Sequence, residues 1–319
     1  MKVFVLANGG TKIGMGHIMR TLVLGKELKN EIPVIYVITN KEEFKPAIKK
    51  VIDEKFNYIY EEDILNEISK EDILIIDRYD LTENDLVFYK SKVKLLMVFD
   101  DNNLLPYYDV DIILNQNLHG VNLNYKANSN TKILVGGEYS LLRDEFLDNK
   151  PIEIKKDINN IILTVGGSDN LNFTHRILKE IKHFSSTINV VIGPAFNDKE
   201  ILMGDFKDYQ NIIFHENANM TELMKKSDLA ISACGSTIYE LSFLGVPSIG
   251  IVIVDNQEKL GQYISENNIA IISKIEDINK NIKSMNYELR KNLSENMKKS
   301  IDGQGKYRVA NEILKSIKE

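Results

Sequence analysis

The sequence predicts an α/β protein of two domains, each built around a parallel sheet. Short continuous apolar runs alternate with helical patterns from the N-terminus, and the alternation starts again after the charged segment Asp148–Asp157, which contains Pro151. Continuous apolar strands separated by helices are typical of parallel sheets that are covered on both faces. A length of 319 residues also suits two domains of roughly 150 residues. We therefore expect one domain over residues 1–150 and a second over residues 151–319.

In the first half, a buried strand at Lys2–Ala7 leads through the glycine-containing loop Gly9–Gly16 into a helix over His17–Lys29, whose apolar residues recur at helical spacing. The other elements of this half are expected as strands at Val34–Ile38, Tyr58–Tyr60, Ile73–Ile76, Val93–Phe99 and Ile112–Leu114, and as helices at Lys41–Asp53 and Ile64–Ile68.

The second half shows the same alternation without repeating the sequence. Its strands are expected at Ile161–Val165, Ile188–Ile192, Ile212–Phe214, Leu229–Ser232 and Pro247–Val254. Its helices are expected at Asn172–Phe184, Met220–Lys226, Thr237–Leu244 and Gln257–Glu266, and over most of the tail Asn286–Glu319. Ligands of such sheets bind beyond the carboxyl ends of the strands, so the functional residues are expected in the loops that follow strands.

The composition limits the kind of partner. Hydrophobic residues make up 43% and charged residues 27% of the chain, as in ordinary globular proteins, and the net charge is −6. A nucleic-acid-binding surface is therefore not expected, and an anionic ligand must be bound locally, by backbone N–H groups and helix N-termini. No apolar run is long enough to span a bilayer. The one cysteine, Cys234, cannot form an internal disulfide, which fits a cytoplasmic protein.

The loop after the first strand contains a candidate general base. Gly14 and Gly16 allow the backbone to approach a ligand closely and to turn into the following helix. His17 falls in the first turn of that helix, where the helix dipole disfavours a positive charge and so favours the neutral imidazole. A neutral histidine can accept a proton from water. A packing role at the helix start explains the same spacing equally well.

Acidic residues follow further strands of the first half. Asp77 and Tyr79 come directly after a buried strand, where side chains can reach a ligand, although a structural role is the commoner use of this pattern. Asp100 and Asp101 form a carboxylate pair that could bind a metal ion or a sugar hydroxyl. The segment Asp109–Asp111 matches the D-x-D pattern that binds manganese in some sugar transferases, but we expect a turn and a strand entry there. No cluster has the ligand spacing of a transition-metal site, so no metal is expected.

Three loops of the second half could bind a diphosphate and its sugar. The turn Gly166–Ser168 and the helix start Gly235–Thr237 offer N–H and hydroxyl donors to an anion. Glu240 falls one turn into that helix, where a carboxylate suits a ribose diol, and Asn256 and Gln257 could bind sugar hydroxyls or cap the next helix. The candidate diphosphate ligands are therefore Gly166, Gly167, Ser168, Gly235, Ser236 and Thr237.

Together, these segments resemble one family, the hydrolases of UDP-2,4-diacetamido-2,4,6-trideoxy-β-L-altropyranose in pseudaminic acid biosynthesis, which are related to the glycosyltransferase that forms peptidoglycan lipid II. The resemblance covers nearly the whole chain, and the order and spacing of its motifs are specific although each motif alone is not. The motifs are Ile13-Gly-Met-Gly-His17-Ile-Met-Arg20, Asp77-Arg-Tyr79, Phe99-Asp-Asp101, Leu114-Asn-Gln-Asn117, Tyr139-Ser-Leu-Leu-Arg143, Gly166-Gly-Ser-Asp169, Cys234-Gly-Ser-Thr-Ile-Tyr-Glu240 and Asp255-Asn-Gln257.

The resemblance implies two Rossmann-like domains that face a cleft, which is the glycosyltransferase B fold, and metal-independent hydrolysis in the cytoplasm without a cofactor. It implies that His17 activates water for attack at the anomeric carbon and that Tyr79 is a functional residue. The second domain is implied to bind UDP, with Glu240 on the ribose and with Asn256 and Gln257 near the sugar. The other implied substrate-binding residues are Gly14, Gly16, Arg20, Asp77, Asp101, Asn117 and the six diphosphate ligands named above.

Two segments depart from the family pattern, and other functions stay open. Leu6-Ala7-Asn8 stands where members often carry Arg-x-Asp, and Arg78-Tyr79 stands where they often carry His-Tyr, so the exact sugar is open. A glycosyltransferase would use an acceptor hydroxyl in place of water. A non-catalytic sensor of sugar nucleotides would not need His17. We expect a monomer whose partners are a UDP-sugar and water.

Overall fold

The computed structural model describes residues 1–10 and 13–318. Thr11 and Lys12 of the expected loop Gly9–Gly16, and Glu319 of the expected helical tail, lie outside the described residues. The chain divides into two compact units. The first unit consists of Met1–Arg143 together with Gly303–Glu319, and the second unit consists of Asp144–Asp302.

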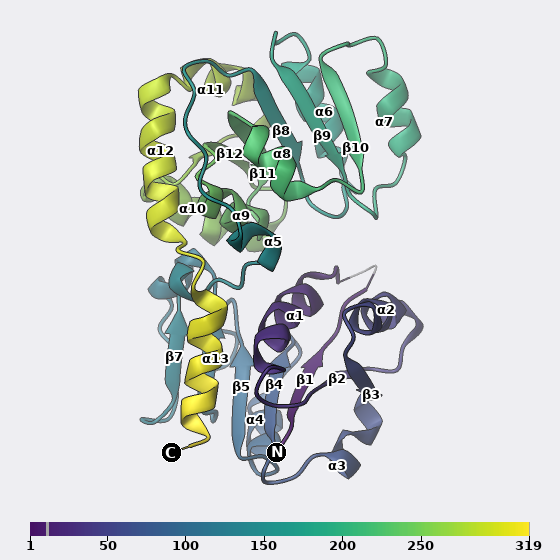
Figure 1. Cartoon of the computed structure of the whole chain (residues 1–319), viewed down its shortest axis with the longest axis vertical. Coiled ribbons are helices and arrows are strands. Elements are labelled where there is room, and N and C mark those ends of the chain that lie inside the picture. The colour runs from purple at the N-terminus through teal and green to yellow at the C-terminus, as the bar shows by residue number, and fades with distance from the viewer. Residues whose placement is uncertain (11–12, 319) are drawn as a thin grey trace. The chain divides into compact units, whose positions relative to one another are not determined.

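The first unit is built on a parallel sheet whose strand order is β3-β2-β1-β4-β5-β6-β7 (Figure 1). The first six strands in chain order follow the 3-2-1-4-5-6 arrangement of the Rossmann fold, and β7 adds a strand at one edge. The strands are β1 (Val3–Ala7), β2 (Val34–Ile38), β3 (Asn57–Tyr60), β4 (Ile73–Asp77), β5 (Leu95–Phe99), β6 (Ile112–Asn115) and β7 (Lys132–Val135).

Helices cover both faces of this sheet, as the apolar strands require. The helices of the unit are α1 (Gly16–Leu28), α2 (Lys45–Asp53), α3 (Ile64–Glu67), α4 (Glu83–Lys90) and α13 (Gly305–Ser316). Alternate residues of each strand enter different cores: Val3 and Val5 of β1 pack with residues of α1, α2 and α13. Phe4 and Leu6 of the same strand pack on the other face, with Leu86 of α4 among others.

The observed domain division differs from the expected one at the C-terminus. Helix α13 packs in the first unit although its sequence follows the second. Val309 and Ile313 of α13 are buried in the same core as Leu24 and Leu28 of α1. At the start of α13, a Cβ on Gly305 would lie 2.2 Å from the backbone oxygen of Ser140, so only glycine fits there. The expected boundary after residue 150 also falls late, since the second unit begins at residue 144.

The second unit repeats the Rossmann arrangement, with the parallel strand order β10-β9-β8-β11-β12-β13 (Figure 1). The strands are β8 (Asn160–Thr164), β9 (Thr187–Ile192), β10 (Ile212–Glu216), β11 (Leu229–Ala233), β12 (Ser248–Ile251) and β13 (Ile271–Ile272). The helices are α5 (Asp144–Leu147), α6 (Phe173–Ile181), α7 (Lys199–Asp205), α8 (Met220–Lys226), α9 (Thr237–Leu244), α10 (Glu258–Glu266), α11 (Ile278–Ser284) and α12 (Tyr287–Ser300). The prediction of parallel α/β architecture in both halves is thereby confirmed, and the fold is that of two Rossmann-like domains.

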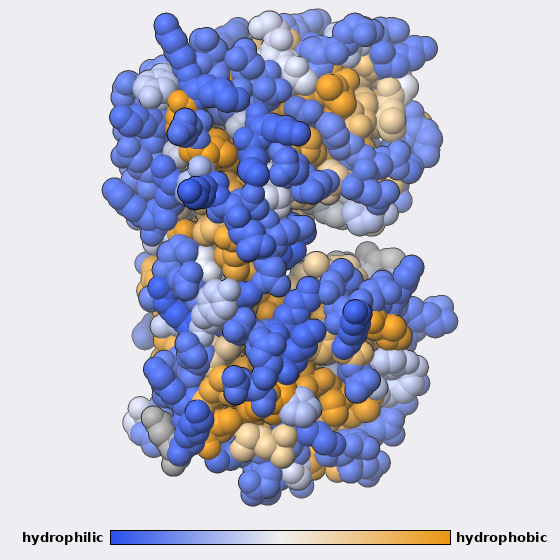
Figure 2. Space-filling view, viewed as in Figure 1, coloured by the Kyte–Doolittle hydropathy of each residue, from blue (hydrophilic) through white to orange (hydrophobic). Residues whose placement is uncertain are grey.

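The surface is mostly polar on the face that Figure 2 shows, with hydrophobic residues in scattered groups. Among the described residues, no helix combines the length and the apolar character that crossing a bilayer requires.

Candidate active site

In each unit, several of the residues singled out by the sequence follow the two neighbouring strands at which the strand order reverses direction. In the first unit these strands are β1 and β4, followed by the Gly14–His17 segment and by the Asp77–Tyr79 segment. In the second unit they are β8 and β11, followed by Gly166–Ser168 and by Gly235–Thr237. Open α/β sheets bind their ligands at this reversal point, beyond the carboxyl ends of the strands.

His17 and Asp77 form a hydrogen-bonded pair in the first unit. Gly16 begins α1, so the His17 side chain leaves the first turn of the helix, and its Nδ1 lies 2.6 Å from Oδ1 of Asp77, the last residue of β4. Burial would raise the pKa of Asp77, but the charge and hydrogen bonds of Arg20, followed by those of His17, hold that pKa well below its usual range. An ionised carboxylate only accepts hydrogen bonds, so Nδ1 of His17 carries a proton, and in the neutral imidazole the lone pair is therefore on Nε2.

The nearby guanidinium of Arg20 supports the same tautomer. Nη2 of Arg20 lies 3.4 Å from Nδ1 of His17, but 2.6 Å from Oδ1 of Asp77. A guanidinium nitrogen can only donate, so the longer contact would be a hydrogen bond only if Nδ1 had no proton. The two short contacts to Asp77 therefore decide the arrangement: both Arg20 and His17 donate to one carboxylate.

Arg20 links Asp77 to a second carboxylate, that of Asp101. Its Nε donates to Oδ2 of Asp77 at 2.6 Å, and its Nη1 lies 2.9 Å from both oxygens of Asp101. Burial opposes the charge of Arg20, but the carboxylates of Asp101 and Asp77 outweigh burial and raise the pKa of Arg20 above its usual range. The guanidinium also lies over the ring of Phe99, 4.8 Å from its centroid. Arg20 is therefore a fixed cation that orders both acids.

Asp101 in turn orders Tyr79 and Asn117. The hydroxyl of Tyr79 donates to Oδ2 of Asp101 at 2.8 Å, and Nδ2 of Asn117 donates to Oδ1 at 2.5 Å. The ring of Tyr79 meets that of His17 edge to face, with centroids 4.7 Å apart. Burial, followed by the charge of Asp101, raises the pKa of Tyr79 above its usual range. Tyr79 is thus a neutral hydrogen-bond donor beside the imidazole, and does not serve as a base near neutral pH.

The neighbouring acids have structural partners. Asp100 accepts the backbone N–H groups of Asn102, Asn103 and Leu104 and the hydroxyl of Tyr108, so it organises the loop after β5. The D-x-D segment Asp109–Asp111 is a strand entry: Asp109 accepts an amide of Asn128, and Asp111 accepts the N–H of Leu96 and pairs with Lys90. Within the described residues, no group of three or more His, Cys, Asp or Glu side chains could hold a metal ion.

The glycine turn after β8 presents its own backbone to solvent, whereas the following helix is already capped. Gly166 has a φ of +103°, which favours glycine, and a Cβ on Gly166 or Gly167 would meet no atom within 4 Å. The carboxylate of Asp169 accepts the N–H groups of Phe173 and Thr174 at 2.7 and 2.8 Å, so the start of α6 is occupied. An anion at this turn would therefore be bound by the N–H groups of the turn itself.

The helix start after β11 is free of such a cap. Ser236 precedes α9 without a side-chain hydrogen bond to it, and Ser236 is exposed while Thr237 is half-buried. Glu240 lies in the first turn of α9. A Cβ on Gly235 would lie 3.7 Å from Nε2 of Gln257, so the loop after β12 approaches this helix start. N–H groups at an uncapped helix start suit a phosphate.

The two remaining residues of this region have different roles. Asn256 is exposed in the short 3-10 helix η5 (Asp255–Gln257), whereas Oε1 of the neighbouring Gln257 accepts the N–H of Ile253. Cys234 is buried, and burial raises the pKa of its thiol to about 12. Cys234 is therefore not suited to act as a nucleophile, because only a thiolate attacks efficiently.

Sequence reasoning missed a polar chain beside this site. Asn8, after β1, bonds Thr39, after β2, and the Thr39 hydroxyl donates to Glu61, after β3. Glu61 pairs with Arg78, whose Nε and Nη2 also bind Asp80 at 2.7 and 2.5 Å. The two positions that depart from the resembled pattern, Asn8 and Arg78, are therefore joined in one network. The signal in the sequence was that Asn8 and Arg78 directly follow two strands, β1 and β4, that are neighbours in the sheet.

Comparisons with known proteins bear on this geometry. Residues 160–313 match the glycosyltransferase family 28 C-terminal domain. The chain is 32% identical over 294 residues to an uncharacterized protein of Methanocaldococcus jannaschii, covering 86% of this chain and 59% of that protein. It is 25% identical over 283 residues to the UDP-2,4-diacetamido-2,4,6-trideoxy-beta-L-altropyranose hydrolase of Campylobacter jejuni, covering 83% of this chain and 97% of the hydrolase.

A solved structure supports the fold independently. MurG of Acinetobacter baumannii matches with a TM-score of 0.69 at 14% identity, covering 99% of this chain and 100% of MurG. At that identity the match shows the fold alone. The chain therefore has the glycosyltransferase B fold, matches the glycosyltransferase family 28 C-terminal domain over residues 160–313, and is related to the protein named UDP-2,4-diacetamido-2,4,6-trideoxy-beta-L-altropyranose hydrolase.

Proposed function

We propose that the chain is a nucleotide-sugar hydrolase, which splits a UDP-activated diacetamido-trideoxy hexose into the free sugar and UDP during pseudaminic acid biosynthesis. The observation that carries this proposal is the His17–Asp77 pair, with its 2.6 Å contact at Nδ1. A carboxylate that holds the Nδ1 proton leaves Nε2 as a base and stabilises the imidazolium that forms when Nε2 takes a proton. The relationship to the Campylobacter jejuni hydrolase supports the same reaction.

In the proposed reaction, Nε2 of His17 removes a proton from a water molecule. The water oxygen forms a bond to the anomeric carbon, and the bond from that carbon to the diphosphate oxygen breaks with its electron pair. UDP leaves with the negative charge, which N–H groups such as those at the start of α9 would stabilise. Asp77 would stabilise the positive imidazole, and Tyr79 and Asp101 would position the sugar or the water. Such a reaction needs no metal and fits a cytoplasmic enzyme.

A glycosyltransferase is the second candidate, because residues 160–313 match a glycosyltransferase domain and MurG shares the fold. In that reaction an acceptor hydroxyl takes the place of water, and His17 removes the proton of the acceptor. The first-unit geometry serves either nucleophile. The absence or presence of turnover without an acceptor therefore separates the two functions.

The test measures UDP release from the UDP-diacetamido-trideoxy hexose, with a chelator and without an acceptor. Wild type is compared with His17→Asn, whose amide can still donate to Asp77 from near the Nδ1 position but supplies no base. His183→Ala, which changes an exposed histidine of the second unit, is the matched control. We expect His17→Asn to lose about 10²–10⁴-fold in kcat, and the control to keep the wild-type rate.

Water labelled with oxygen-18 identifies the bond that breaks. Attack at the anomeric carbon places the label on the free sugar, whereas attack at phosphorus places it on UDP. Label in UDP, or an unchanged rate in His17→Asn, would overturn the mechanism. If the UDP-sugar binds but UDP is released only after an acceptor is added, the protein is a glycosyltransferase and not a hydrolase.

A further inference from the structure

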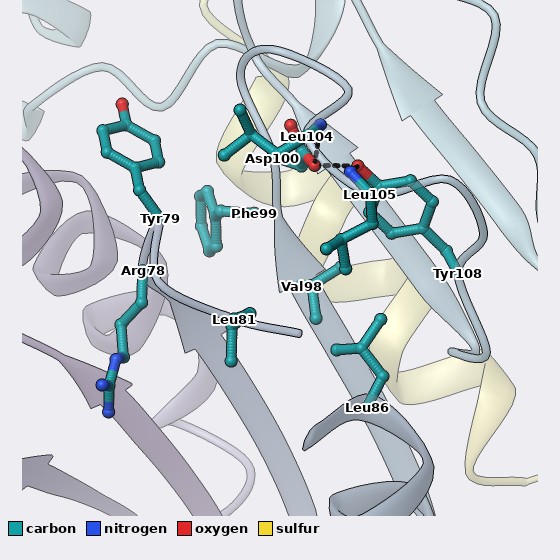
Figure 3. Close-up of a pocket in the computed structure, with 10 residues that line it drawn as sticks. All are labelled: Arg78, Tyr79, Leu81, Leu86, Val98, Phe99, Asp100, Leu104, Leu105 and Tyr108. Atoms are coloured by element: carbon teal, nitrogen blue, oxygen red, sulfur yellow. Dashed lines mark hydrogen bonds between the residues drawn. The ribbon is translucent and has the colours of Figure 1, made fainter. Parts of the chain in front are cut away.

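A small pocket lies at the carboxyl ends of β4 and β5, next to the His17 site (Figure 3). It is small and partly open to solvent, and all of its lining residues belong to the first unit. Tyr79 and Phe99 border it on the side of the active site. The proposed reaction assigns no role to this pocket.

The floor and walls of the pocket are apolar. They are formed by the side chains of Leu81, Leu86, Val98, Leu104 and Leu105. The loop that carries Leu104 and Leu105 is held in place, because the N–H of Leu104 donates to Asp100 and the N–H of Leu105 donates to the Tyr108 hydroxyl. The pocket is thus preformed, as ligand pockets usually are.

The polar groups that border the pocket are already engaged. Both carboxylate oxygens of Asp100 accept hydrogen bonds from its own loop and from Tyr108. The Tyr79 hydroxyl donates to Asp101, and the guanidinium of Arg78 binds Asp80 and Glu61, directed away from the leucines in Figure 3. A hydroxyl placed among the leucines would lose its hydrogen bonds to water and gain none from the protein, which is energetically costly. The pocket therefore selects for an apolar group.

Two residues of the pocket also contact the His17–Arg20 site. Tyr79 borders the pocket, and its ring contacts that of His17 with centroids 4.7 Å apart. Phe99 borders it as well and supports the guanidinium of Arg20 at 4.8 Å. Tyr79 therefore lies between the pocket and the imidazole of His17, and Phe99 lies between the pocket and Arg20.

We propose that this pocket is a specificity subsite for a methyl-sized apolar substituent of the sugar, either the methyl of an acetamido group or a C6 methyl. The inference rests on the proposed function, since it takes a sugar nucleotide as the ligand. Burying one methyl group contributes about fourfold to binding or to kcat/KM, which is the equivalent of about 0.8 kcal/mol. A substituent that ends in a hydroxyl is disfavoured by a larger factor.

The test varies the size of the sugar substituent and the size of the pocket and compares the resulting preferences. One arm compares nucleotide sugars with N-formyl, N-acetyl and N-propionyl groups, and the other compares 6-deoxy with 6-hydroxy sugars, so the two sources of a methyl are distinguished. Leu105→Ala enlarges the pocket, and so does Leu104→Ala, at a residue that is 48% exposed. Leu65→Ala, at a residue 52% exposed in α3, is the control.

We expect wild type to favour acetyl over formyl, or 6-deoxy over 6-hydroxy, by at least about fourfold in kcat/KM. Both pocket variants should shift the preference by a similar factor toward propionyl, if the acetamido arm is correct, or should lose the 6-deoxy preference, if the C6 arm is correct. The control should keep the wild-type ratios. Ratios that stay unchanged in both pocket variants, with melting temperature and turnover retained, overturn the subsite.

A failure of the proposed function gives a different result. If wild type releases no UDP from any of these sugars, the same ratios are measured as dissociation constants by calorimetry. Selective binding that depends on Leu104 and Leu105 then supports the subsite in a protein that is not a hydrolase. Binding without any dependence on these leucines overturns it.

Discussion

Replacing Asp77 with asparagine removes the charge that joins His17 to Arg20 while keeping the size of the side chain. In the wild type, Oδ1 accepts from both His17 and Arg20, and Oδ2 accepts from Arg20 Nε. Whether the amide NH₂ of asparagine takes the Oδ1 or the Oδ2 position, it faces an N–H donor of Arg20. If the NH₂ takes the Oδ1 position, it also donates to Nδ1 of His17 and moves the ring proton to Nε2, so the base is lost.

Two magnitudes follow for Asp77→Asn. Removing one partner of a buried ion pair costs about 3–5 kcal/mol, and we expect the lower end because Arg20 keeps its contacts of 2.9 Å to Asp101. About 3 kcal/mol corresponds to a fall of roughly 6–12 °C in the Tm of a domain of about 150–250 residues, the range in which the first unit falls. The loss of the proton-accepting tautomer should reduce kcat by about 10²–10⁴-fold.

The pH dependence of stability provides a second check on Asp77. The pKa of this carboxyl is lowered on folding, so its contribution is fully present above the unfolded-state value near 4 and is lost as the pH falls through the lower folded-state value. The difference in the free energy of unfolding between wild type and Asp77→Asn should therefore be largest at neutral pH and should shrink below about pH 4.

Urea unfolding at several pH values and steady-state UDP release measure these effects. Asp53→Asn, at an exposed carboxylate of α2 in the same unit, is the matched control and should change neither quantity. A folded Asp77→Asn variant whose kcat stays within tenfold of the wild type would refute the role of Asp77 in fixing the His17 tautomer. A difference in stability that does not depend on pH would refute the ionised state of Asp77.

Two further predictions concern one residue in each unit. Tyr79→Phe keeps the ring against His17 but removes the 2.8 Å hydrogen bond to Asp101. Because a hydrogen bond to a charged group contributes about 1.5–3 kcal/mol, kcat/KM should fall at least about tenfold. An unchanged kcat/KM would contradict the positioning role of Tyr79. Gly166→Ala forces alanine to a φ of +103° at a cost of about 1–3 kcal/mol and should weaken UDP binding in calorimetry. Gly204→Ala, in α7 with open space around it, should leave UDP affinity unchanged, and equal effects of both substitutions would contradict the assignment.

The sequence was sufficient for the fold class because the central strands are apolar on both faces. Periodicity alone could not detect β7 (Lys132–Val135), where a lysine opens a short run, or α4, in which only Leu86 is buried. The capping box of Thr82 and Asp85 marked the start of α4 in the sequence. The tail, expected to be mostly helical, forms two helices, α12 and α13, and the sequence analysis did not locate the break between them, where Gly303 has a φ of +75°.

In the first unit, the sequence located the strand ends at which these side chains meet, but not the different hydrogen-bond partners of the neighbouring acids. Asp100 and Asp101 are adjacent and chemically identical, yet Asp100 holds its own loop and Asp101 binds Arg20. Which of two neighbouring side chains faces a site depends on the local backbone, and the sequence does not reveal it. Phe99 was read as the end of a strand, and its contact with Arg20 depends on packing between β5 and α1.

The return of α13 to the first unit has a consequence for the order in which the chain folds. The helix is synthesised after the whole second unit, yet Val309 and Ile313 complete the core that contains Leu24 and Leu28 of α1, the helix that bears His17. While the ribosome is still making residues 144–302, that face of α1 has no permanent partner. The first unit to leave the ribosome is thus the last to be finished, and the helix that bears His17 acquires its final packing only when translation has passed the second unit.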